Sequence, residues 1–209
     1  YLTGRTLLGA RNRLHAGCVV GDAPQDLKYR GEPTRLLIGD DNVFREHVTV
    51  HRSNKLEEDT VIGAHNFLMA GSHVAHNCHL GDHVILANGA LLAGHVEVGD
   101  RAFISGNCLI HQFVRVGTLA LMQGGAGISQ DLPPFTIAVV VAFVWGKQIV
   151  LTAPVNRLDA ALAFFAALRR AAHHHEVVGI AHEVDFVVLS TDRLADGVLH
   201  HADVPQRPQ

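Results

Sequence analysis

The stretch AGSHVAHNCHLGDHVILANGALLAGHVEVGD, residues 70–100, concentrates side chains that could perform chemistry. It contains five histidines, His73, His76, His79, His83 and His95. Imidazole titrates near neutral pH, so such a cluster fits general base catalysis, proton transfer or metal binding. It could equally be the polar surface of a repeat. The choice depends on how the chain places these rings in space.

The chain repeats with a period of six residues. Steps of six from 62 to 128 meet only aliphatic residues or methionine: Ile62, Leu68, Val74, Leu80, Leu86, Leu92, Val98, Ile104, Ile110, Val116, Met122 and Ile128. The same frame appears earlier: Leu2, Leu8, Leu14, Val20, Ile38, Phe44 and Val50. This period predicts a parallel β-helix of the hexapeptide type, in which three hexads make one coil and each key aliphatic side chain points into a triangular prism.

The repeat also suggests the domain organisation. Residues 26–37 and 53–61 break the frame and should form loops on one face. The coils should end near 129–138, where Pro133 and Pro134 cannot continue a strand ladder. We therefore expect a mainly β fold with a β-helix over 1–138 and a linker and small α-helical part over 139–209.

The C-terminal part has its own local signals. The apolar segment 139–154 fits a strand or a linker, Asn156 fits the N-cap of a helix, and a second helix is expected over 192–201. At the other end the frame is already in phase at Leu2, so we expect further coils before Tyr1.

Composition limits the class of function. The net charge is −3, which gives no footprint for nucleic acid. The sequence contains no run of 18 apolar residues, so we expect no transmembrane helix. It shows no basic segment followed by an apolar one at its start, so we expect no signal peptide. Cys18, Cys78 and Cys108 are odd in number and scattered, which favours a reducing compartment and a cytoplasmic protein.

The period places the histidines. His76, His95 and His111 are 19 and 16 residues apart, close to one 18-residue coil, so they should lie near one edge of the prism with His73 beside them. Metal sites on this repeat, as in γ-class carbonic anhydrases, use a His-x4-His pair, and no two histidines here are five apart. We therefore expect no metal site. The remaining coil histidines are interpreted as surface residues: His47, His51, His65, His79 and His83.

Three segments carry a resemblance to a known family. They are PQDLKYRGEPTRLLIGDDNVFREHVTVHR (24–52), the histidine-rich stretch 70–100, and IHQFVRVG with GISQDLPPF (110–117 and 127–135). Over about 1–138 the chain resembles the UDP-N-acetylglucosamine O-acyltransferases of lipid A biosynthesis. The loop Q-D-L-K-Y-x-G-E-P-T and the motif H-x-x-H-x-C are the specific features.

The resemblance implies a left-handed β-helix and a homotrimer with its groove between subunits. It implies transfer of a (3R)-hydroxyacyl chain from acyl carrier protein to the glucosamine 3-hydroxyl of UDP-N-acetylglucosamine, without a covalent intermediate. It implies no cofactor beyond the 4'-phosphopantetheine of acyl carrier protein.

The resemblance also assigns residues. His76 matches the general base, and Gly94 matches the backbone donor for the oxyanion. Asp26 and Lys28 match residues that hold the sugar, and Gly124 matches the position that measures the acyl chain. The groove for nucleotide, sugar and pantetheine is matched by His73, His95, His111 and Gln112. Where the best-studied pattern has Asp beside the base, this chain has Asn77.

The chain departs from the family after residue 138. The usual Gly-Asn dipeptide and the Gly-Leu-x-Arg-Arg-Gly-Phe segment, at the uridine and phosphate end, are replaced by VVVAFVWGKQIVLTAPVNRLD, with only Lys147 and Arg157 as cations. Two alternatives therefore stay open. One is an acyltransferase for another nucleotide sugar, such as a 3-amino sugar. The other is a catalytically silent scaffold.

Overall fold

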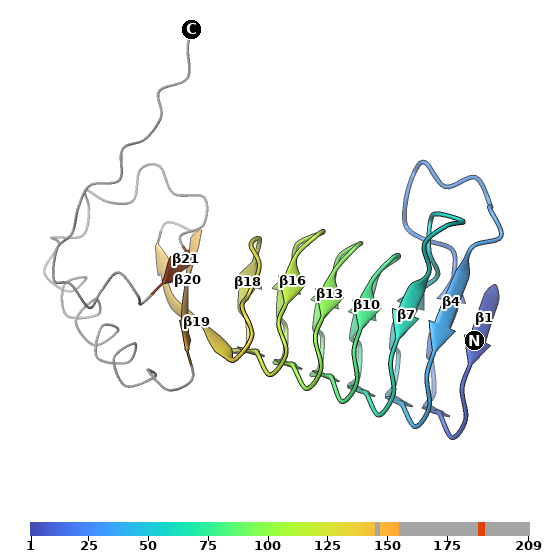
Figure 1. The fold of residues 1–209 in the computed structure, drawn as a ribbon, viewed down its shortest axis with the longest axis horizontal. Coiled ribbons are helices and arrows are strands. Elements are labelled where there is room, and N and C mark those ends of the chain that lie inside the picture. Colours follow the sequence, from blue (N-terminus) through green and yellow to red (C-terminus); the bar gives the residue numbers. More distant parts are fainter. Residues whose placement is uncertain (145–146, 155–187, 191–209) are drawn as a thin grey trace, which may run out of the picture.

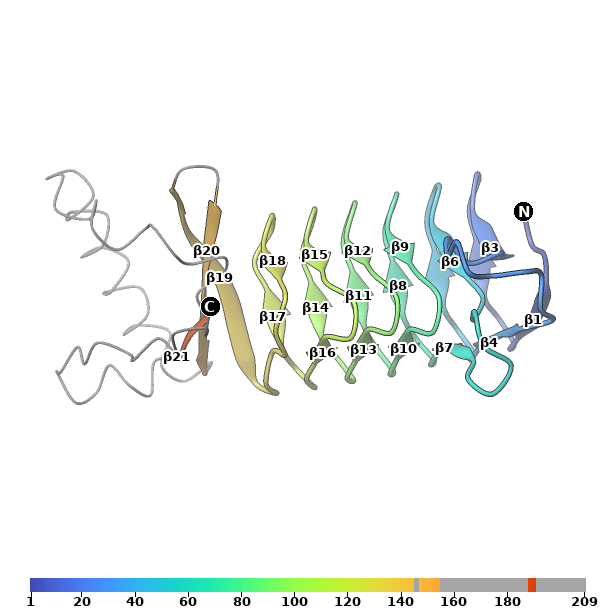
Figure 2. The same cartoon turned by 90° about the horizontal axis from the view of Figure 1, so that it is seen from above.

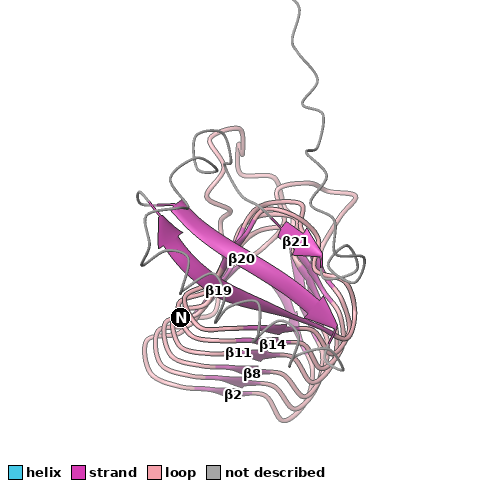
Figure 3. Cartoon of the chain, turned by 90° about the vertical axis from the view of Figure 1, so that its left-hand side faces the viewer, coloured by secondary structure: helices cyan, strands magenta, loops and turns pink. Residues whose placement is uncertain are grey.

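The computed structural model describes residues 1–144, 147–154 and 188–190. Within these residues the chain is a left-handed parallel β-helix, as expected. Three parallel sheets form the walls of a triangular prism, and each coil adds one strand to each wall (Figures 1 and 3). Parallel strands of one wall are joined through the two other walls, so the chain needs only short turns at three edges.

The walls consist of short strands. The first wall contains β1 (Arg5–Leu8), β4 (Arg35–Ile38), β7 (Thr60–Ile62), β10 (His79–Leu80), β13 (Glu97–Val98) and β16 (Arg115–Val116). The second wall contains β2 (Arg13–Leu14), β5 (Val43–Phe44), β8 (Phe67–Leu68), β11 (Ile85–Leu86), β14 (Phe103–Ile104) and β17 (Leu121–Met122). The third wall contains β3 (Val19–Asp22), β6 (Thr49–His51), β9 (His73–Val74), β12 (Leu91–Leu92), β15 (Leu109–Ile110) and β18 (Gly127–Ile128).

The six-residue frame fills the core of the prism. All twelve key side chains from Ile62 to Ile128 are buried, with exposed fractions of 5% or less. A second position, two residues before each key residue, is also buried and was not predicted. It holds small or medium side chains at the turns: Thr60, Asn66, Ser72, Cys78, Val84, Ala90, Val96, Ala102, Cys108, Val114, Ala120 and Ala126.

The frame is less well buried at the N-terminal end. Leu2, Leu8 and Leu14 are in phase with the frame but 53%, 38% and 37% exposed. The physical reason is that these residues form the first coil, and no described residue packs on its outer side. From Val20 onward the key positions are buried.

One residue in most hexads adopts a left-handed backbone conformation. His65, Asn77, His83, His95 and Arg101 have φ between +56° and +61°, and they recur at multiples of six residues. Histidine and asparagine are enriched among the residues that tolerate this conformation. Part of the histidine content is therefore explained by turn geometry.

Two insertions leave the prism near its N-terminal end. Figures 1 and 2 show the loops before β4 and before β7 emerging there side by side. Residues that pair between neighbouring coils are 30 apart in sequence across the first loop (Val20 and Val50) and 24 apart across the second (Val50 and Val74). It is 18 residues from β12 to β15.

The coil stack continues past Pro133 and Pro134 for one more strand. Leu132 still pairs with Val116. β19 (Thr136–Val144) then pairs with β17 and turns into an antiparallel hairpin with β20 (Lys147–Pro154), followed by β21 (Val188–Ser190). The segment 139–154 is thus mostly strand. The helices expected from Asn156 and over 192–201 lie outside the described residues. No helix in the described part of the chain is long and apolar enough to cross a membrane.

Candidate active site

His76 lies at an edge of the prism, two residues after the end of β9, and its ring is held by the next residue. The Nδ1 atom is 2.9 Å from Oδ1 of Asn77. Asn77 is itself buried and has the left-handed conformation described above, with φ of 58°. Its backbone N–H donates to Oγ1 of Thr60 at 2.7 Å. The turn thus fixes Asn77, and Asn77 fixes the imidazole.

The hydrogen bonds around Asn77 determine which nitrogen of His76 carries the proton. The backbone N–H of Asn54 can only donate, and it lies 3.0 Å from Oδ1 of Asn77. Nδ2 of Asn77 donates to Oγ of Ser53 at 2.8 Å. Oδ1 of Asn77 must therefore accept from Nδ1–H of His76. In the neutral ring this leaves Nε2 with a free lone pair, as a general base requires.

Gly94 lies one coil above His76 and is buried against its ring. A Cβ atom at residue 94 would stand 2.6 Å from Cε1 and 2.9 Å from Nε2 of His76. Glycine is required here by the ring and not by the backbone angle. The Gly94 N–H has no hydrogen-bond acceptor among the described residues. A backbone N–H without a partner in a buried residue is uncommon and leaves a donor available to a ligand.

His95 follows Gly94 and completes a column of rings. Its ring meets that of His76 edge-on, with centroids 5.3 Å apart, and stacks on Phe113 at 4.6 Å. Its Nδ1 lies 3.6 Å from Oε1 of Glu58, from the second insertion. Burial lowers the pKa of His95, and the Glu58 carboxylate opposes that shift. The ring is therefore more often neutral than a free histidine.

A chain of hydrogen bonds joins the first insertion to the base. Oδ2 of Asp26 accepts from Nδ2 of Asn54 at 2.7 Å, and the backbone of Asn54 bonds to Asn77. The backbone N–H of Lys28, followed by the amide of Asn54, lowers the pKa of Asp26. Asp26 is therefore an anionic acceptor close to His76, while the Lys28 side chain is exposed. Asn54 was missed by sequence reasoning, since an insertion carries no period.

His73 lies in β9 of the third wall, and its ring is half-buried. Its Nδ1 is 2.7 Å from Oγ1 of Thr49, and its ring meets His51 edge-on at 4.9 Å. Burial, aided by the nearby His51 and His76, lowers the pKa of His73 to about 4. His73 is therefore neutral at physiological pH and acts as a polar, uncharged group beside the base.

The interpretation of His51 as a surface residue is wrong. It is 7% exposed, and its Nδ1 has no hydrogen-bond partner in the part of the chain that the structure describes. The ring is enclosed because β6 lies between β3 and β9, which bring Asp22 and His73 against it. Burial is the main cause that lowers the pKa of His51.

The other surface interpretations fit the structure. His47, His65 and His83 occupy left-handed turn positions, and the rings of His65 and His83 stack at 4.8 Å. His79 is exposed, and its Nε2 is 3.0 Å from the backbone oxygen of Asp59. No group of three or more histidine, cysteine or acidic residues in the described ranges is arranged to hold a metal ion.

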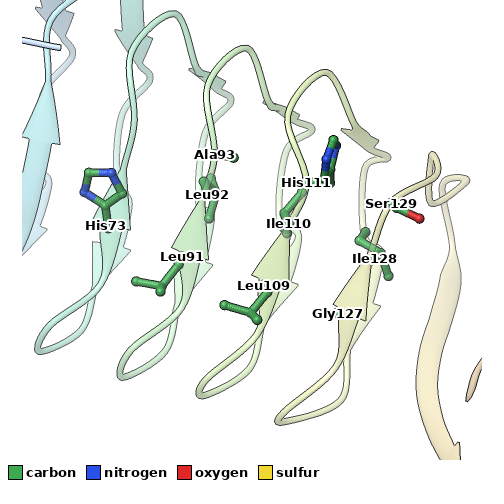
Figure 4. Close-up of a pocket in the computed structure, with 10 residues that line it drawn as sticks. All are labelled: His73, Leu91, Leu92, Ala93, Leu109, Ile110, His111, Gly127, Ile128 and Ser129. Carbon is green, nitrogen blue, oxygen red and sulfur yellow. The ribbon is translucent and has the colours of Figure 1, made fainter. Parts of the chain in front are cut away.

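Two depressions flank the edge that carries His76, Gly94 and His95. One is an apolar groove of about 410 Å³ along the third wall, drawn in Figure 4. It is lined by His73, Leu91, Leu92, Ala93, Leu109, Ile110, His111, Gly127, Ile128 and Ser129. The second, also about 410 Å³, is polar and is lined by Lys55, Glu58, Asn77, His79, His95, Glu97, Phe113 and Arg115.

The structure brings only some of the expected site residues together. His76, Gly94, His95 and His73 are neighbours, and Asp26 joins them through Asn54. His111 and Gln112 are exposed at the same edge one coil further on, and His111 forms a 3.2 Å contact with the backbone oxygen of Gln112. Gly124 lies at another edge, where β18 begins, so the apolar groove of the third wall runs between that edge and the His76 edge.

The fold and the site together indicate the class of protein. Residues 59–94 match the model of the bacterial transferase hexapeptide family (six repeats). The architecture is that of a hexapeptide-repeat transferase, with the candidate site at an edge of the coil stack.

Comparison with whole structures narrows the class. The crystal structure of a UDP-N-acetylglucosamine acyltransferase from Bacteroides fragilis is 33% identical, with a TM-score of 0.69 over 86% of this chain and 69% of that chain. The enzyme from Arabidopsis is 34% identical, with a TM-score of 0.67 over 86% and 64% of the two chains. This chain belongs to the UDP-N-acetylglucosamine acyltransferase family.

Curated relatives agree over a shorter span. The acyl-acyl-carrier-protein–UDP-N-acetylglucosamine O-acyltransferase of Syntrophobacter fumaroxidans is 49% identical over 78 residues, which are 37% of this chain and 30% of that protein. The protein of Gloeothece citriformis with the same name is 52% identical over 77 residues. The chain thus matches less than a third of the length of these relatives.

Proposed function

We propose that the protein transfers a (3R)-hydroxyacyl chain from acyl carrier protein to the glucosamine 3-hydroxyl of UDP-N-acetylglucosamine, the first step of lipid A biosynthesis. The observation that carries the proposal is the pairing of His76 with Gly94. His76, with a free Nε2 lone pair, lies against Gly94, whose backbone N–H has no acceptor among the described residues. Acyl transfer to a hydroxyl requires this combination of a proton acceptor and an oxyanion donor.

The proposed reaction proceeds in two steps. Nε2 of His76 removes the proton from the sugar 3-hydroxyl while that oxygen attacks the thioester carbonyl carbon, and the N–H of Gly94 donates to the resulting oxyanion. The tetrahedral intermediate then collapses, its C–S bond breaks, and the thiolate of the phosphopantetheine takes the proton from Nε2–H. Asn77 keeps the ring oriented throughout, but its neutral amide supplies no charge to the imidazolium.

The two depressions are suited to different parts of the proposed substrates. The apolar groove is suited to a hydrocarbon chain, and Leu91 and Leu109 are 40% and 54% exposed along it. The polar pocket and the Asp26–Asn54 pair are suited to a sugar nucleotide, and the buried Oδ1 of Asn54 has no partner within the described ranges. His111, Gln112 and Lys28 are proposed to complete the nucleotide, sugar and pantetheine contacts.

The oligomeric state and the cellular compartment are part of the same proposal. The apolar groove is open along one side in a single chain, and a neighbouring subunit of a homotrimer is proposed to close it. Acyl carrier protein and the sugar nucleotide are cytoplasmic substrates, so the protein is proposed to act in the cytoplasm. No cofactor is proposed beyond the phosphopantetheine that carries the acyl chain.

A product assay tests the proposal. The protein is incubated with (3R)-hydroxyacyl carrier protein and UDP-N-acetylglucosamine, and the acylated nucleotide is identified by mass spectrometry. His76→Ala should lower turnover at least about 100-fold, because a general base contributes roughly 10²–10⁴-fold. His79→Ala is the control on the next strand: His79 lines the polar pocket, so its loss can raise KM for the nucleotide, but it should leave kcat unchanged.

Each contrary result has a distinct meaning. An amide product formed only from a 3-amino sugar nucleotide would replace the proposed acceptor. Absence of product from either nucleotide would favour the silent scaffold. Equal losses from His76→Ala and His79→Ala would remove His76 from its role.

A further inference from the structure

Cys78 closes the motif H-x-x-H-x-C, and the proposed reaction gives it no task. Its side chain is fully buried at the turn below Ala93 and Gly94. Its Sγ lies 3.1 Å from the backbone oxygen of Ala93. Burial raises the pKa of Cys78 to about 12, so the sulfur keeps its proton and donates to that oxygen.

The acceptor of Cys78 belongs to the peptide group that provides the oxyanion donor. The carbonyl of Ala93 and the N–H of Gly94 share one planar unit, and no peptide bond among the described residues is cis. In a planar trans peptide the C=O and N–H point in opposite directions. A carbonyl held toward the buried sulfur therefore turns the Gly94 N–H away from it.

Among the described residues, the thiol is the only hydrogen-bond partner of this carbonyl. No backbone N–H in the described residues donates to the oxygen of Ala93, although the flanking groups are paired: Ala93 N–H donates to Ile110, and Gly94 C=O accepts from Phe113. Loss of the S–H donor would leave the peptide restrained only by its neighbours.

Packing alone does not require a thiol at residue 78. The same buried turn position holds Val84, Val96 and Val114 in other coils, and Ser72 in another. Cys18 occupies it near the N-terminal end and donates to the backbone oxygen of Arg45 at 2.9 Å, far from His76. The turn tolerates valine, serine and cysteine, so their exchange changes the donor with little change in the fold.

We propose that Cys78 is a positioning residue, which holds the Ala93–Gly94 peptide so that the Gly94 N–H faces the oxyanion formed beside His76. The inference deepens the proposed acyl transfer and rests on it. Removal of an entire oxyanion donor costs about 10²–10³-fold in turnover. If the Gly94 N–H is still present but less firmly oriented, turnover should fall less, by about 10-fold.

The test compares four variants in the complete protein, by steady-state kinetics and thermal melting. Cys78→Val removes the donor with a residue native to this turn, and Cys78→Ala repeats the removal with a smaller one. Cys78→Ser retains a donor. Cys18→Val removes a thiol from the same turn position, where the acceptor, the Arg45 oxygen, also accepts from the Val48 N–H at 3.3 Å and serves no proposed reaction.

We expect kcat to fall about 10-fold in Cys78→Val and Cys78→Ala, while KM for both substrates stays within twofold, because the donor acts on the transition state. Cys78→Ser should recover at least half of kcat, and Cys18→Val should match the wild type. A merely structural role would affect the Cys18 and Cys78 variants alike and would not separate kcat from KM.

Three results would overturn the inference while leaving acyl transfer intact. They are a kcat within twofold of wild type in both Cys78→Val and Cys78→Ala, an equal loss in Cys18→Val, and a folded Cys78→Ser variant with no recovery. Absence of turnover in the wild-type protein would refute the proposed function and this inference with it.

Discussion

Substitution of Gly94 by alanine gives the most direct test of how closely the base is placed. The new Cβ would lie 2.6 Å from Cε1 of His76, whereas ordinary contact begins at 3.4 Å, so the ring must move by roughly 0.8 Å. The ring is held on the other side by Asn77 and lies against His95. Misplacement of a reacting group by about 1 Å can cost about 10²-fold in rate. We therefore expect kcat to fall about 100-fold.

A matched control separates this steric effect from a general effect of alanine. Gly106 has the same place in its hexad two turns later, and a Cβ there would meet only the backbone oxygen of Asn88 at 3.3 Å. Neither glycine has a positive φ, so the backbone accepts alanine at both positions. Gly106→Ala should leave the melting temperature nearly unchanged, whereas the clash with His76 should lower that of Gly94→Ala modestly. Steady-state assays of Gly94→Ala and Gly106→Ala decide the matter. Turnover of Gly94→Ala within threefold of wild type, or an equal loss in Gly106→Ala, would refute the reasoning.

Three further predictions address the surroundings of the base. Asn77→Ala should destabilise the protein by about 1–3 kcal/mol in urea unfolding and lower kcat about 10-fold, because the Asn54 N–H loses its acceptor and His76 its orientation; unchanged stability would contradict the network. The pKa of His73 is about 4 in the folded chain against 6.5 for free histidine, so the unfolded chain takes up its proton first. Stability should then be full above pH 6.5 and fall toward pH 4, by up to about 2 kcal/mol between pH 7.5 and 5; His73→Gln should flatten this dependence, and an unaltered dependence would count against it. Gly124→Met should shift preference from fourteen- toward ten-carbon hydroxyacyl carrier proteins in a competition assay, since a Cβ there has room and a longer side chain would obstruct the tail; a wild type that prefers ten carbons would remove Gly124 as the ruler.

The main repeat could be predicted from sequence because its signal is both periodic and apolar. From Ile62 to Ile128 every key residue is large, apolar and buried, so hydropathy alone locates it. The second buried position could not be found in this way. It includes Thr60, Asn66 and Ser72 as well as Val84, and these residues share size but not polarity.

The candidate site was predictable only where it coincides with the repeat. The 18-residue coil places His76 next to Gly94 and His95, which the structure confirms as neighbours. The link from Asp26 through Asn54 to Asn77 joins two insertions, and their conformation depends on tertiary contacts that no period encodes. The burial of His51 depends on the same irregular region.

The 18-residue register also means that the protein can change length only in discrete steps. A segment of 18 residues added within the stack would keep every key residue in phase and lengthen the prism by one strand spacing, about 4.8 Å. The register grows to 30 and 24 residues where the two loops leave the prism, so extra chain of other lengths is expelled from the stack. The span of the apolar groove is therefore quantised, and its capacity could be altered by adding or deleting whole coils while the turn that carries His76 stays unchanged.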